Sequence, residues 1–254
     1  MFKKFKTIGW FLRNPKYIPQ VFQVLKRRKN KAQENTLEEA TKWCSDNAIT
    51  LEKAIEILTG NKGDAEIAKI FPGEMDAANK AADASPVKMG GEGATSFIYQ
   101  LARDSGAKKI IETGVAYGWS SLAILLAIKD NQGAMLISND MPYINMGNDD
   151  YVGCVVPDSL KDKWDLQRLP DVKGIPLALK KFNGEIDFCH YDSDKSYTGR
   201  EWASPILWKA LKPGGYFVSD DINDNLAFKH FCTAVNRQPV IIKHLDKYVG
   251  VIVK

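Results

Sequence analysis

The sequence lacks three features that would assign it to a class at once: a long apolar run, paired cysteines and, over its first 31 residues, any acidic side chain. No apolar run approaches the roughly 18 residues needed to cross a bilayer. The start also lacks the apolar core and small-residue cleavage site of a secretory signal, so we expect a cytoplasmic protein. The scattered cysteines form no C-x-x-C pair, which predicts reduced, mostly buried thiols rather than a disulfide framework or a zinc site: Cys44, Cys154, Cys189 and Cys232.

The charge is distributed unevenly along the chain. The net charge is +4, but residues 1–31 contain ten Lys or Arg side chains, which leaves 25 basic against 31 acidic residues in the remainder. A mildly acidic body argues against a nucleic-acid substrate held across its surface. The 254 residues suffice for one α/β domain with a full core and an N-terminal extension.

Residues 1–31 interleave these basic side chains with aromatic and aliphatic ones, and Pro15 and Pro19 divide the segment into short helices. Such a mixture suits an anionic membrane surface, because the rings lie at headgroup level and the lysines face lipid phosphate. This interpretation predicts peripheral contact with the inner face of a membrane. The alternative is that the short helices pack on the body, or on a partner subunit in a homo-oligomer, with a solvated basic face.

The stretch that organises the rest of the chain covers residues 110–121. The apolar run KKIIETG turns at glycines and continues into SSLAILLAIKD, whose apolar spacing is helical, so the stretch predicts a strand, a tight loop and a helix. Gly114 and Gly118 permit positive φ and let a ligand lie against bare backbone. Ser120 or Ser121 is expected to cap the helix, whose free N–H groups face the ligand.

A carboxylate at the end of this strand distinguishes the loop from a dinucleotide fingerprint. That fingerprint is G-x-G-x-x-G, whereas the pattern here is Glu112-x-Gly114-x-Ala116-x-Gly118. A carboxylate there repels a pyrophosphate but suits a ligand that carries an ammonium and a sulfonium group. The pattern therefore favours S-adenosylmethionine over NAD, and an ordinary βα turn without a ligand is the alternative.

Strands alternate with helices over the rest of the chain, which predicts a parallel sheet with ligands at the carboxyl ends of its strands. Asp140 ends the second strand about 20 residues past the loop, where a carboxylate can accept both ribose hydroxyls; an ordinary turn residue is the alternative. Asp171, after the third strand, is expected to meet the adenine edge. Residues 143–163 indicate an insertion or active-site flap, and residues 239–254 a closing hairpin.

Three carboxylates follow two later strands: Asp192 comes after the fourth, and Asp220 and Asp221 after the fifth. We expect these ends beside the Gly-rich loop, where adjacent unpaired carboxylates repel one another. A divalent cation resolves that repulsion, and all-oxygen ligation suits Mg²⁺ or Mn²⁺, which would lower the pKa of a substrate hydroxyl. Alternatively, Asp220 and Asp221 merely cap a helix that begins near Asn223.

Lys195 lies three residues beyond Asp192 on the same loop. Beside a metal its ammonium form is disfavoured, which would make it a base for a substrate hydroxyl, whereas the flanking carboxylates push its pKa the other way. A solvated lysine is the alternative. His190, within the fourth strand, is interpreted as a packed histidine rather than a base.

Taken in this order, the segments IIETGVAYGWSSLAIL, ISNDMP, IDFCHYDSDKSY and LKPGGYFVSDDINDNLAF resemble the class I S-adenosylmethionine-dependent methyltransferases. Within that class they are most similar to the group of macrolide-sugar and other glycosyl O-methyltransferases. The likeness covers residues 90–254 and implies an α/β fold, a Rossmann-like, doubly wound sheet of seven strands with the last antiparallel. Residues 1–89 would form a helical N-terminal region.

The resemblance also implies roles for the residues singled out above. The metal positions of the metal-dependent members correspond to Asp192, Asp220 and Asp221. The family loop usually carries His where Lys195 stands, but catechol-type O-methyltransferases place a lysine there as the base. Ala116 replaces the usual middle glycine. The cofactor positions, from methionine end to ribose and adenine, are Glu112, Gly114, Ala116, Gly118, Ser120, Ser121, Asp140 and Asp171.

We therefore predict in-line transfer of a methyl group from sulfonium to a substrate oxygen, with Asp192 and Lys195 at the catalytic centre and a metal orienting a vicinal diol. The expected acceptor is a hydroxyl of a sugar, a glycan or a glycosylated metabolite; a catechol-like small molecule is the second choice. The competing class is a non-catalytic S-adenosylmethionine-binding protein. Three clustered acids argue against it, because a scaffold has no need of them.

Overall fold

The computed structural model describes residues 2–29, 31–63, 65–144 and 146–254. The side chains of residues 2–6, 8, 23, 24, 28 and 29 lie outside this description, and with them part of the basic set on which the membrane prediction rests. The four cysteines are free thiols, three of them buried, as the sequence predicts. No helix in the described ranges is long and apolar enough to span a membrane.

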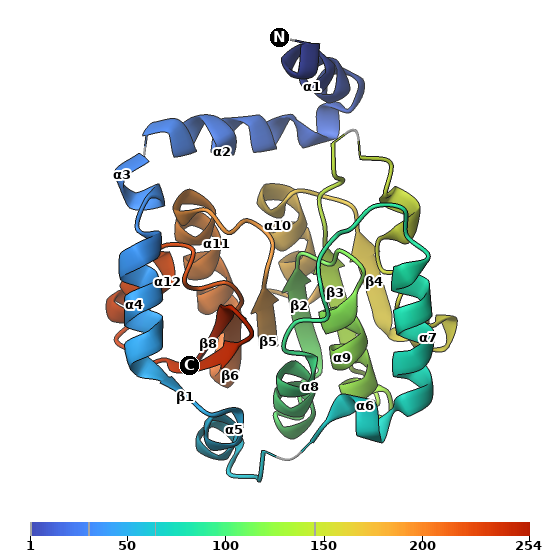
Figure 1. Ribbon diagram of the computed structural model, residues 1–254, viewed down its shortest axis with the longest axis vertical. Helices are drawn as coiled ribbons and strands as arrows, with labels where there is room; N and C mark the ends of the chain where they lie inside the picture. The colour runs from blue at the N-terminus through green and yellow to red at the C-terminus, as the bar shows by residue number, and fades with distance from the viewer. Residues whose placement is uncertain (1, 30, 64, 145) are drawn as a thin grey trace.

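An eight-stranded sheet forms the centre of the molecule, with the strand order β1-β7-β8-β6-β5-β2-β3-β4 (Figure 1). Strand β8 runs antiparallel to both of its neighbours, whereas the other neighbouring pairs are parallel. The predicted Rossmann-like sheet is confirmed, including its antiparallel last strand, and β1 is an additional strand of two residues at the edge. The strands are β1 (Ala48–Ile49), β2 (Lys109–Thr113), β3 (Met135–Asn139), β4 (Trp164–Gln167), β5 (Ile186–Tyr191), β6 (Leu211–Ser219), β7 (Val240–His244) and β8 (Lys247–Val253).

Helices cover both faces of the sheet, because alternate residues of its central strands point to opposite sides. Ile110 belongs to the core under α8 (Thr95–Asp104) and α9 (Trp119–Ile128), and Ile111 to the core under α10 (Asp171–Lys181), α11 (Tyr197–Ala210) and α12 (Ala227–Ala234). Helix α9 is buried at eight of its ten positions, which explains why SSLAILLAI is apolar almost all round.

The order of the strands fixes where a ligand can bind. Strand β2 pairs with β3 on one side and with β5 on the other, so the chain changes direction at β2. In an open parallel sheet, the crevice at such a switch point lies beyond the carboxyl ends of the strands. The Gly-rich loop and the loop that begins at Asp192 therefore meet at this edge.

The N-terminal region is helical, as predicted, but it belongs to the same body as the sheet. Strand β1 pairs with β7, and Ile55 and Ile67 share a core with Phe97. Its elements are α1 (Phe2–Arg13), a 3₁₀ turn (Pro15–Tyr17), α2 (Ile18–Lys29), α3 (Lys31–Glu34), α4 (Leu37–Asn47), α5 (Leu51–Thr59), α6 (Ile67–Ile70) and α7 (Pro72–Asp83).

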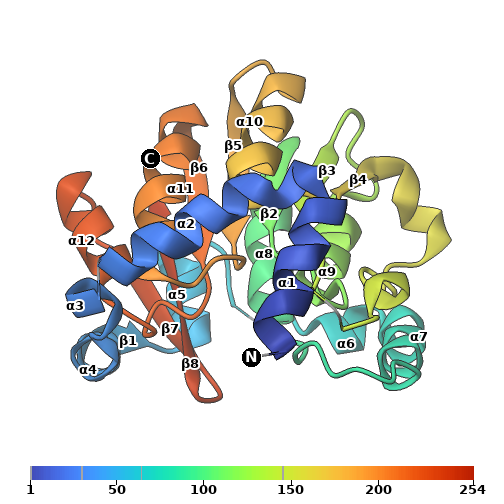
Figure 2. The same ribbon diagram turned by 90° about the horizontal axis from the view of Figure 1, so that it is seen from above.

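Helix α2 lies across the carboxyl end of the sheet (Figures 1 and 2). Just before it, the Tyr17 hydroxyl donates to the backbone oxygen of Arg168 at 3.1 Å, beyond β4. Near its end, Arg27 forms an ion pair with Asp194, beyond β5. Glu34 then accepts hydrogen bonds from two backbone N–H groups in the first turn of α11, at 2.8 and 3.1 Å. Packing on the body, the alternative for the basic segment, is thus observed over this stretch.

Candidate functional site

The Gly-rich loop turns tightly beneath the loop after β5. Gly114 has φ +80°, and a Cβ built on it would lie 2.5 Å from the backbone oxygen of Asp192, so a side chain cannot be accommodated there. Ala116 also adopts positive φ, at +49°, and Gly118 has φ +96° directly before α9. The predicted bare-backbone turn is therefore present.

Glu112 lies on β2 with its carboxylate fully buried. It accepts hydrogen bonds from the hydroxyls of Ser120 at 2.5 Å, Ser121 at 2.5 Å and Ser138 at 2.7 Å. The two serines of α9 therefore bond to Glu112, and the prediction that one of them caps the helix is wrong. The prediction that the carboxylate faces the ligand also needs correction, because the start of α9 closes over it.

His190 stands between Glu112 and Asp220 and is fully buried. Its Nδ1 lies 3.5 Å from the Glu112 carboxylate and its Nε2 lies 3.4 Å from the Asp220 carboxylate. Burial opposes the charged imidazole, but the two carboxylates outweigh it and raise the pKa of His190 to about 10. The interpretation of His190 as a packed histidine is thus confirmed, and the two carboxylates beside its ring favour the protonated form.

Asp140 follows β3 and is buried. Its Oδ1 accepts from the Val115 N–H at 2.9 Å, and its Oδ2 accepts from Arg168 at 2.6 Å. Burial raises the pKa of Asp140, and these donors oppose that rise. The carboxylate thus fixes the Gly-rich loop, and its role toward a ribose stays a prediction.

Asp171 is the first residue of α10 and accepts from the Ser193 hydroxyl at 2.5 Å. Burial raises its pKa to about 7. Together with Gly114 and Asp140 it lines a cavity of about 430 Å³, which Gln20 and Arg27 of α2 close from above. Of the predicted cofactor positions, Gly114, Asp140 and Asp171 line this cavity, whereas Ala116 and Ser120 line a second one.

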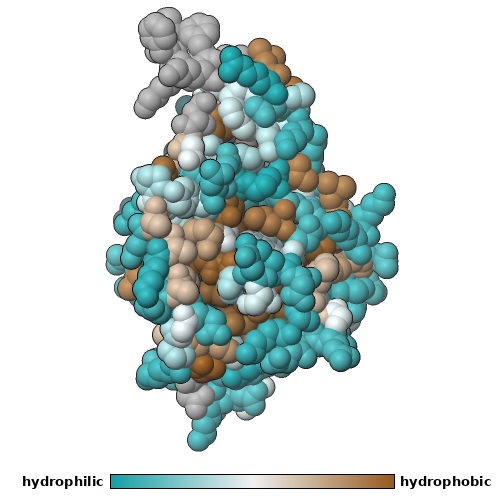
Figure 3. Space-filling model, turned by 90° about the vertical axis from the view of Figure 1, so that its right-hand side faces the viewer, coloured by the Kyte–Doolittle hydropathy of each residue, from teal (hydrophilic) through white to brown (hydrophobic). Residues whose placement is uncertain are grey.

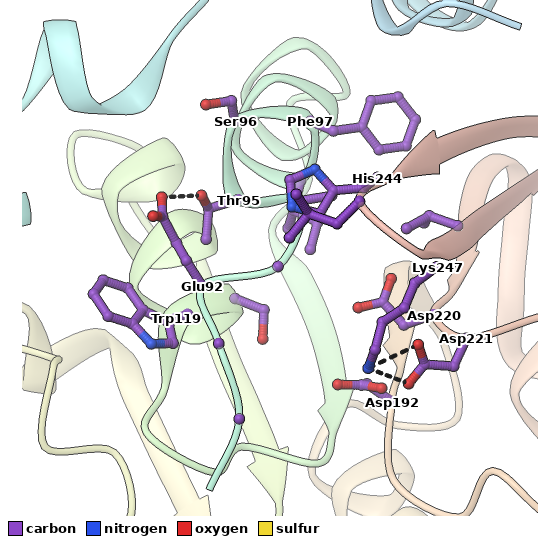
Figure 4. A pocket seen from close by; sticks show the side chains of 18 of the residues that line it. Glu92, Thr95, Ser96, Phe97, Trp119, Asp192, Asp220, Asp221, His244 and Lys247 are labelled. Atoms are coloured by element: carbon purple, nitrogen blue, oxygen red, sulfur yellow. Dashed lines mark hydrogen bonds and ion pairs between the residues drawn. The ribbon is translucent and has the colours of Figure 1, made fainter. Parts of the chain in front are cut away.

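The three predicted metal ligands converge beyond β5 and β6, on one wall of a second cavity (Figure 4). Lys195 lies 3.0 Å from Asp192 and forms an ion pair with Asp221. Lys247, from the start of β8, places its ammonium 2.9 and 3.0 Å from the two oxygens of Asp221. Helix α12 begins at Ala227, so neither aspartate caps a helix near residue 223.

These ammonium groups determine the charge state of the cluster. Burial opposes the charged form of Lys195, but Asp192 and Asp221 outweigh it and raise the pKa of Lys195. Burial and the neighbouring Asp220 raise the pKa of Asp192 to about 6. In this arrangement Lys195 is protonated, so a base role requires another positive charge beside the carboxylates.

The donor set suits a hard cation, because it offers carboxylate oxygens and because Oδ1 of Asp220 is buried and accepts no hydrogen bond from any described group. However, no three His, Cys, Asp or Glu side chains in the described ranges are arranged to hold a metal as they stand. Lys195 pairs with Asp192 and Asp221 instead, and Lys247 pairs with Asp221. The Mg²⁺ or Mn²⁺ site therefore stays a prediction.

The second cavity has a volume of about 950 Å³, and its opposite sides differ in polarity. Asp192, Asp220, Asp221 and Lys247 lie on one wall, and Trp119 faces them across the space (Figure 4). The loop over residues 89–94 supplies a third side; there Glu92 accepts from the Thr95 hydroxyl at 2.8 Å. Polar groups beside one aromatic ring suit a polyhydroxylated ligand.

The predicted flap, residues 143–163, is fastened to the Gly-rich loop. Gly153 donates its N–H to the Ala116 oxygen at 2.9 Å, and Val155 donates to the Tyr117 oxygen at 3.1 Å. A Cβ on Gly153 would lie 2.4 Å from the Trp164 ring. Residues 153–155 are thus packed against the Gly-rich loop, and Tyr143, at the start of the segment, lines the smaller cavity.

Sequence reasoning missed Lys247, Arg168 and Trp119, and it undervalued His190. One signal was available for His190. Ser138, Glu112 and His190 occupy matching register positions on β3, β2 and β5, so buried polar residues stand side by side on three neighbouring strands. Lys247 and Arg168 carried no such signal, because their partners lie on other loops.

Comparisons with known proteins place this site in context. Residues 111–222 match the family model described as a methyltransferase domain, and this range contains every predicted site residue. No curated protein matches the chain. This match covers a little under half of the chain, and the N-terminal helices lie outside the matched range.

Solved structures share the fold. The chain resembles an O-methyltransferase from Bacillus cereus in complex with S-adenosylhomocysteine, with 15% identity and a TM-score of 0.50 over 86% of this chain and 100% of that one. It also resembles a tomaymycin-synthesis O-methyltransferase of Streptomyces achromogenes in complex with S-adenosylmethionine, with 15% identity and a TM-score of 0.56 over 70% of this chain and 90% of that one. A Podospora anserina methyltransferase bound to S-adenosylhomocysteine shares 15% identity and a TM-score of 0.52 over 85% of this chain and 94% of that one.

Proposed function

We propose that this protein, an S-adenosylmethionine-dependent methyltransferase, transfers the methyl group to a hydroxyl oxygen of a sugar, a glycan or a glycosylated metabolite. One observation carries the proposal: the two cavities meet, because Asp192 and Lys195 line both of them. A methyl donor in the smaller cavity and an acceptor in the larger one would therefore meet at these two side chains. Such alignment supplies much of the rate enhancement in a two-substrate transfer.

In the cofactor cavity, the backbone of Gly114 would lie against the methionine part, and Asp140 and Asp171 would bind the ribose and the adenine. Glu112 would not contact the cofactor but would hold the start of α9 in place, because its carboxylate accepts hydrogen bonds from Ser120 and Ser121. The O-methyltransferases with the same fold that were determined with S-adenosylmethionine or S-adenosylhomocysteine support this choice of ligand.

In the acceptor cavity, Asp192 and Asp220 can accept hydrogen bonds from sugar hydroxyls, and Trp119 offers the apolar face of a sugar ring a surface to pack on. The same ring would stack on a catechol, which is why a catechol belongs in the acceptor test. Asp192, Asp220 and Asp221 would hold a divalent cation. Bound there, Mg²⁺ would supply the positive charge that lowers the pKa of an acceptor hydroxyl and of Lys195.

The experiment is a methyl-transfer assay with isotopically labelled S-adenosylmethionine against a panel of glycosides and catechols, each with Mg²⁺ and with EDTA. We expect transfer to vicinal diols of sugars and loss of transfer in EDTA. Asp192→Asn should abolish transfer while S-adenosylhomocysteine still raises the melting temperature. Cofactor binding without transfer to any acceptor would indicate the non-catalytic class, and a preference for catechols would indicate the second acceptor class.

A further inference from the structure

Helix α2 exposes an apolar stripe to solvent. Ile18, Phe22 and Leu25 stand at positions i, i+4 and i+7, which places them on one side of the helix. They are 37%, 68% and 48% exposed. Three large apolar side chains in a row on one helix face form a continuous surface, unlike the singly scattered apolar residues of an ordinary protein exterior.

The opposite side of α2 is occupied by the body of the protein. Gln20 and Arg27 lie about 180° around the axis from the stripe and line the cofactor cavity. Arg27 forms its ion pair with Asp194, and Tyr17 is buried just before the helix. These contacts hold α2 in one rotational setting, so the stripe faces outward while the helix is packed in place.

Basic side chains surround the stripe, and acidic ones are missing from this part of the sequence. Lys26 on α2 is exposed, as are Arg13 and Lys16 in the segment just before this helix, and residues 1–31 contain no Asp or Glu. Figure 3 shows hydrophobic surface beside hydrophilic surface on the upper part of the molecule, where the N-terminal segment lies. An apolar stripe with basic flanks matches an anionic lipid surface in both hydrophobicity and charge.

We propose that α2 docks this protein on an anionic membrane through Ile18, Phe22 and Leu25, while Gln20 and Arg27 on its other side continue to close the cofactor cavity. The apolar side chains would enter the boundary between headgroups and acyl chains, and the exposed cations would face lipid phosphate. Docking leaves the contacts of Tyr17 and Arg27 in place, because these residues face the body. Lys26, whose ammonium lies 3.4 Å from the Glu201 carboxylate, would exchange that exposed ion pair for lipid phosphate. The proposal is independent of the methyl acceptor.

The test is co-sedimentation of the full chain with vesicles of phosphatidylcholine and phosphatidylglycerol at a ratio of about 7:3. We expect binding at low salt that falls as salt rises, and little binding to phosphatidylcholine alone. The double variant Phe22→Ser/Leu25→Ser should lower the partition coefficient on the order of tenfold or more, because it removes two large apolar contacts. The matched control, Ile57→Ser/Leu177→Ser, replaces two exposed apolar side chains on α5 and α10 and should bind like the parent chain.

Two further measurements keep the outcome unambiguous. The S-adenosylhomocysteine-induced rise in melting temperature should be the same in both double variants, which shows that each is folded. Equal sedimentation of the two double variants, or no sedimentation of the parent chain, would overturn the proposal. It would also be overturned if light scattering without lipid found a dimer that Phe22→Ser/Leu25→Ser dissociates, because the stripe would then be an interface between two copies of this chain.

Discussion

The Lys247 ammonium lies 2.9 Å from Oδ1 and 3.0 Å from Oδ2 of Asp221, so one side chain of β8 spans both oxygens of a carboxylate beyond β6. Lys195 reaches the same carboxylate from the loop after β5. Although burial opposes it, these two ammonium groups lower the pKa of Asp221. The chain's own cations thus neutralise the cluster that the sequence assigns to a divalent ion.

Removing Lys247 should therefore strengthen metal binding. Lys247→Met takes away a positive charge that competes with the ion for Asp221, and we expect the Mn²⁺ affinity to rise about tenfold or more. The free-ion signal in electron paramagnetic resonance measures this without turnover. Lys243→Met, on the neighbouring strand, is the control and should bind like the parent chain. Equal affinities in all three proteins would show that Lys247 does not compete with the ion.

Lys195→Ala should separate catalysis from binding. If Lys195 accepts the proton of the acceptor hydroxyl, turnover should fall by roughly 10²–10⁴-fold. Cofactor affinity should change little, because the contacts at Asp140 and Asp171 remain. The measurements are single-turnover methyl transfer and calorimetric titration with S-adenosylhomocysteine. The exposed Lys180→Ala serves as the control, and a parallel loss of cofactor affinity in Lys195→Ala would point to a binding role instead.

Because of His190, the free energy of unfolding should decrease as the pH rises above neutrality. Its folded pKa is raised to about 10 from an ordinary value near 6.5, so its contribution is fully present below about pH 6.5 and is lost as pH rises through 10. Removing one member of a buried charge group costs about 3–5 kcal/mol, which is the loss in unfolding free energy that we expect for His190→Leu at pH 7. Denaturant titrations from pH 6 to 10 should show a shallower decline for this variant. The exposed His230→Leu should retain the parent profile.

Two glycines with the same backbone angle test how the flap is held. Gly133 and Gly153 both have φ +74°, but a Cβ on Gly133 meets nothing within 4 Å, whereas one on Gly153 would lie 2.4 Å from the Trp164 ring. Gly133→Ala should cost only the conformational strain, about 1–2 kcal/mol. Gly153→Ala should cost a further 1–3 kcal/mol or so through overpacking. Chemical denaturation measures both, and equal losses would mean that Trp164 moves aside freely.

Sequence patterns alone were sufficient for the alternation of strands and helices and for the grouping of polar residues at the ends of strands. The alternation of apolar strands with helices depends on spacing within a few residues, so it could be read without the partners. The Gly-rich turn was equally readable, because positive φ at Gly114 and Gly118 is a local requirement. Asp192, Asp220 and Asp221 could be grouped because the carboxyl ends of parallel strands meet at one edge.

The tertiary structure alone decided which charges face one another. Lys247 reaches Asp221, Arg168 reaches Asp140 and Arg27 reaches Asp194, although 26, 28 and 167 residues separate the partners in sequence. Helical and strand periodicity fixes which way a side chain points relative to its neighbours in the chain, but not what stands opposite it. Those pairings depend on how strands, hairpin and N-terminal helix pack together, and they determine whether the acids hold protons, lysines or a metal ion.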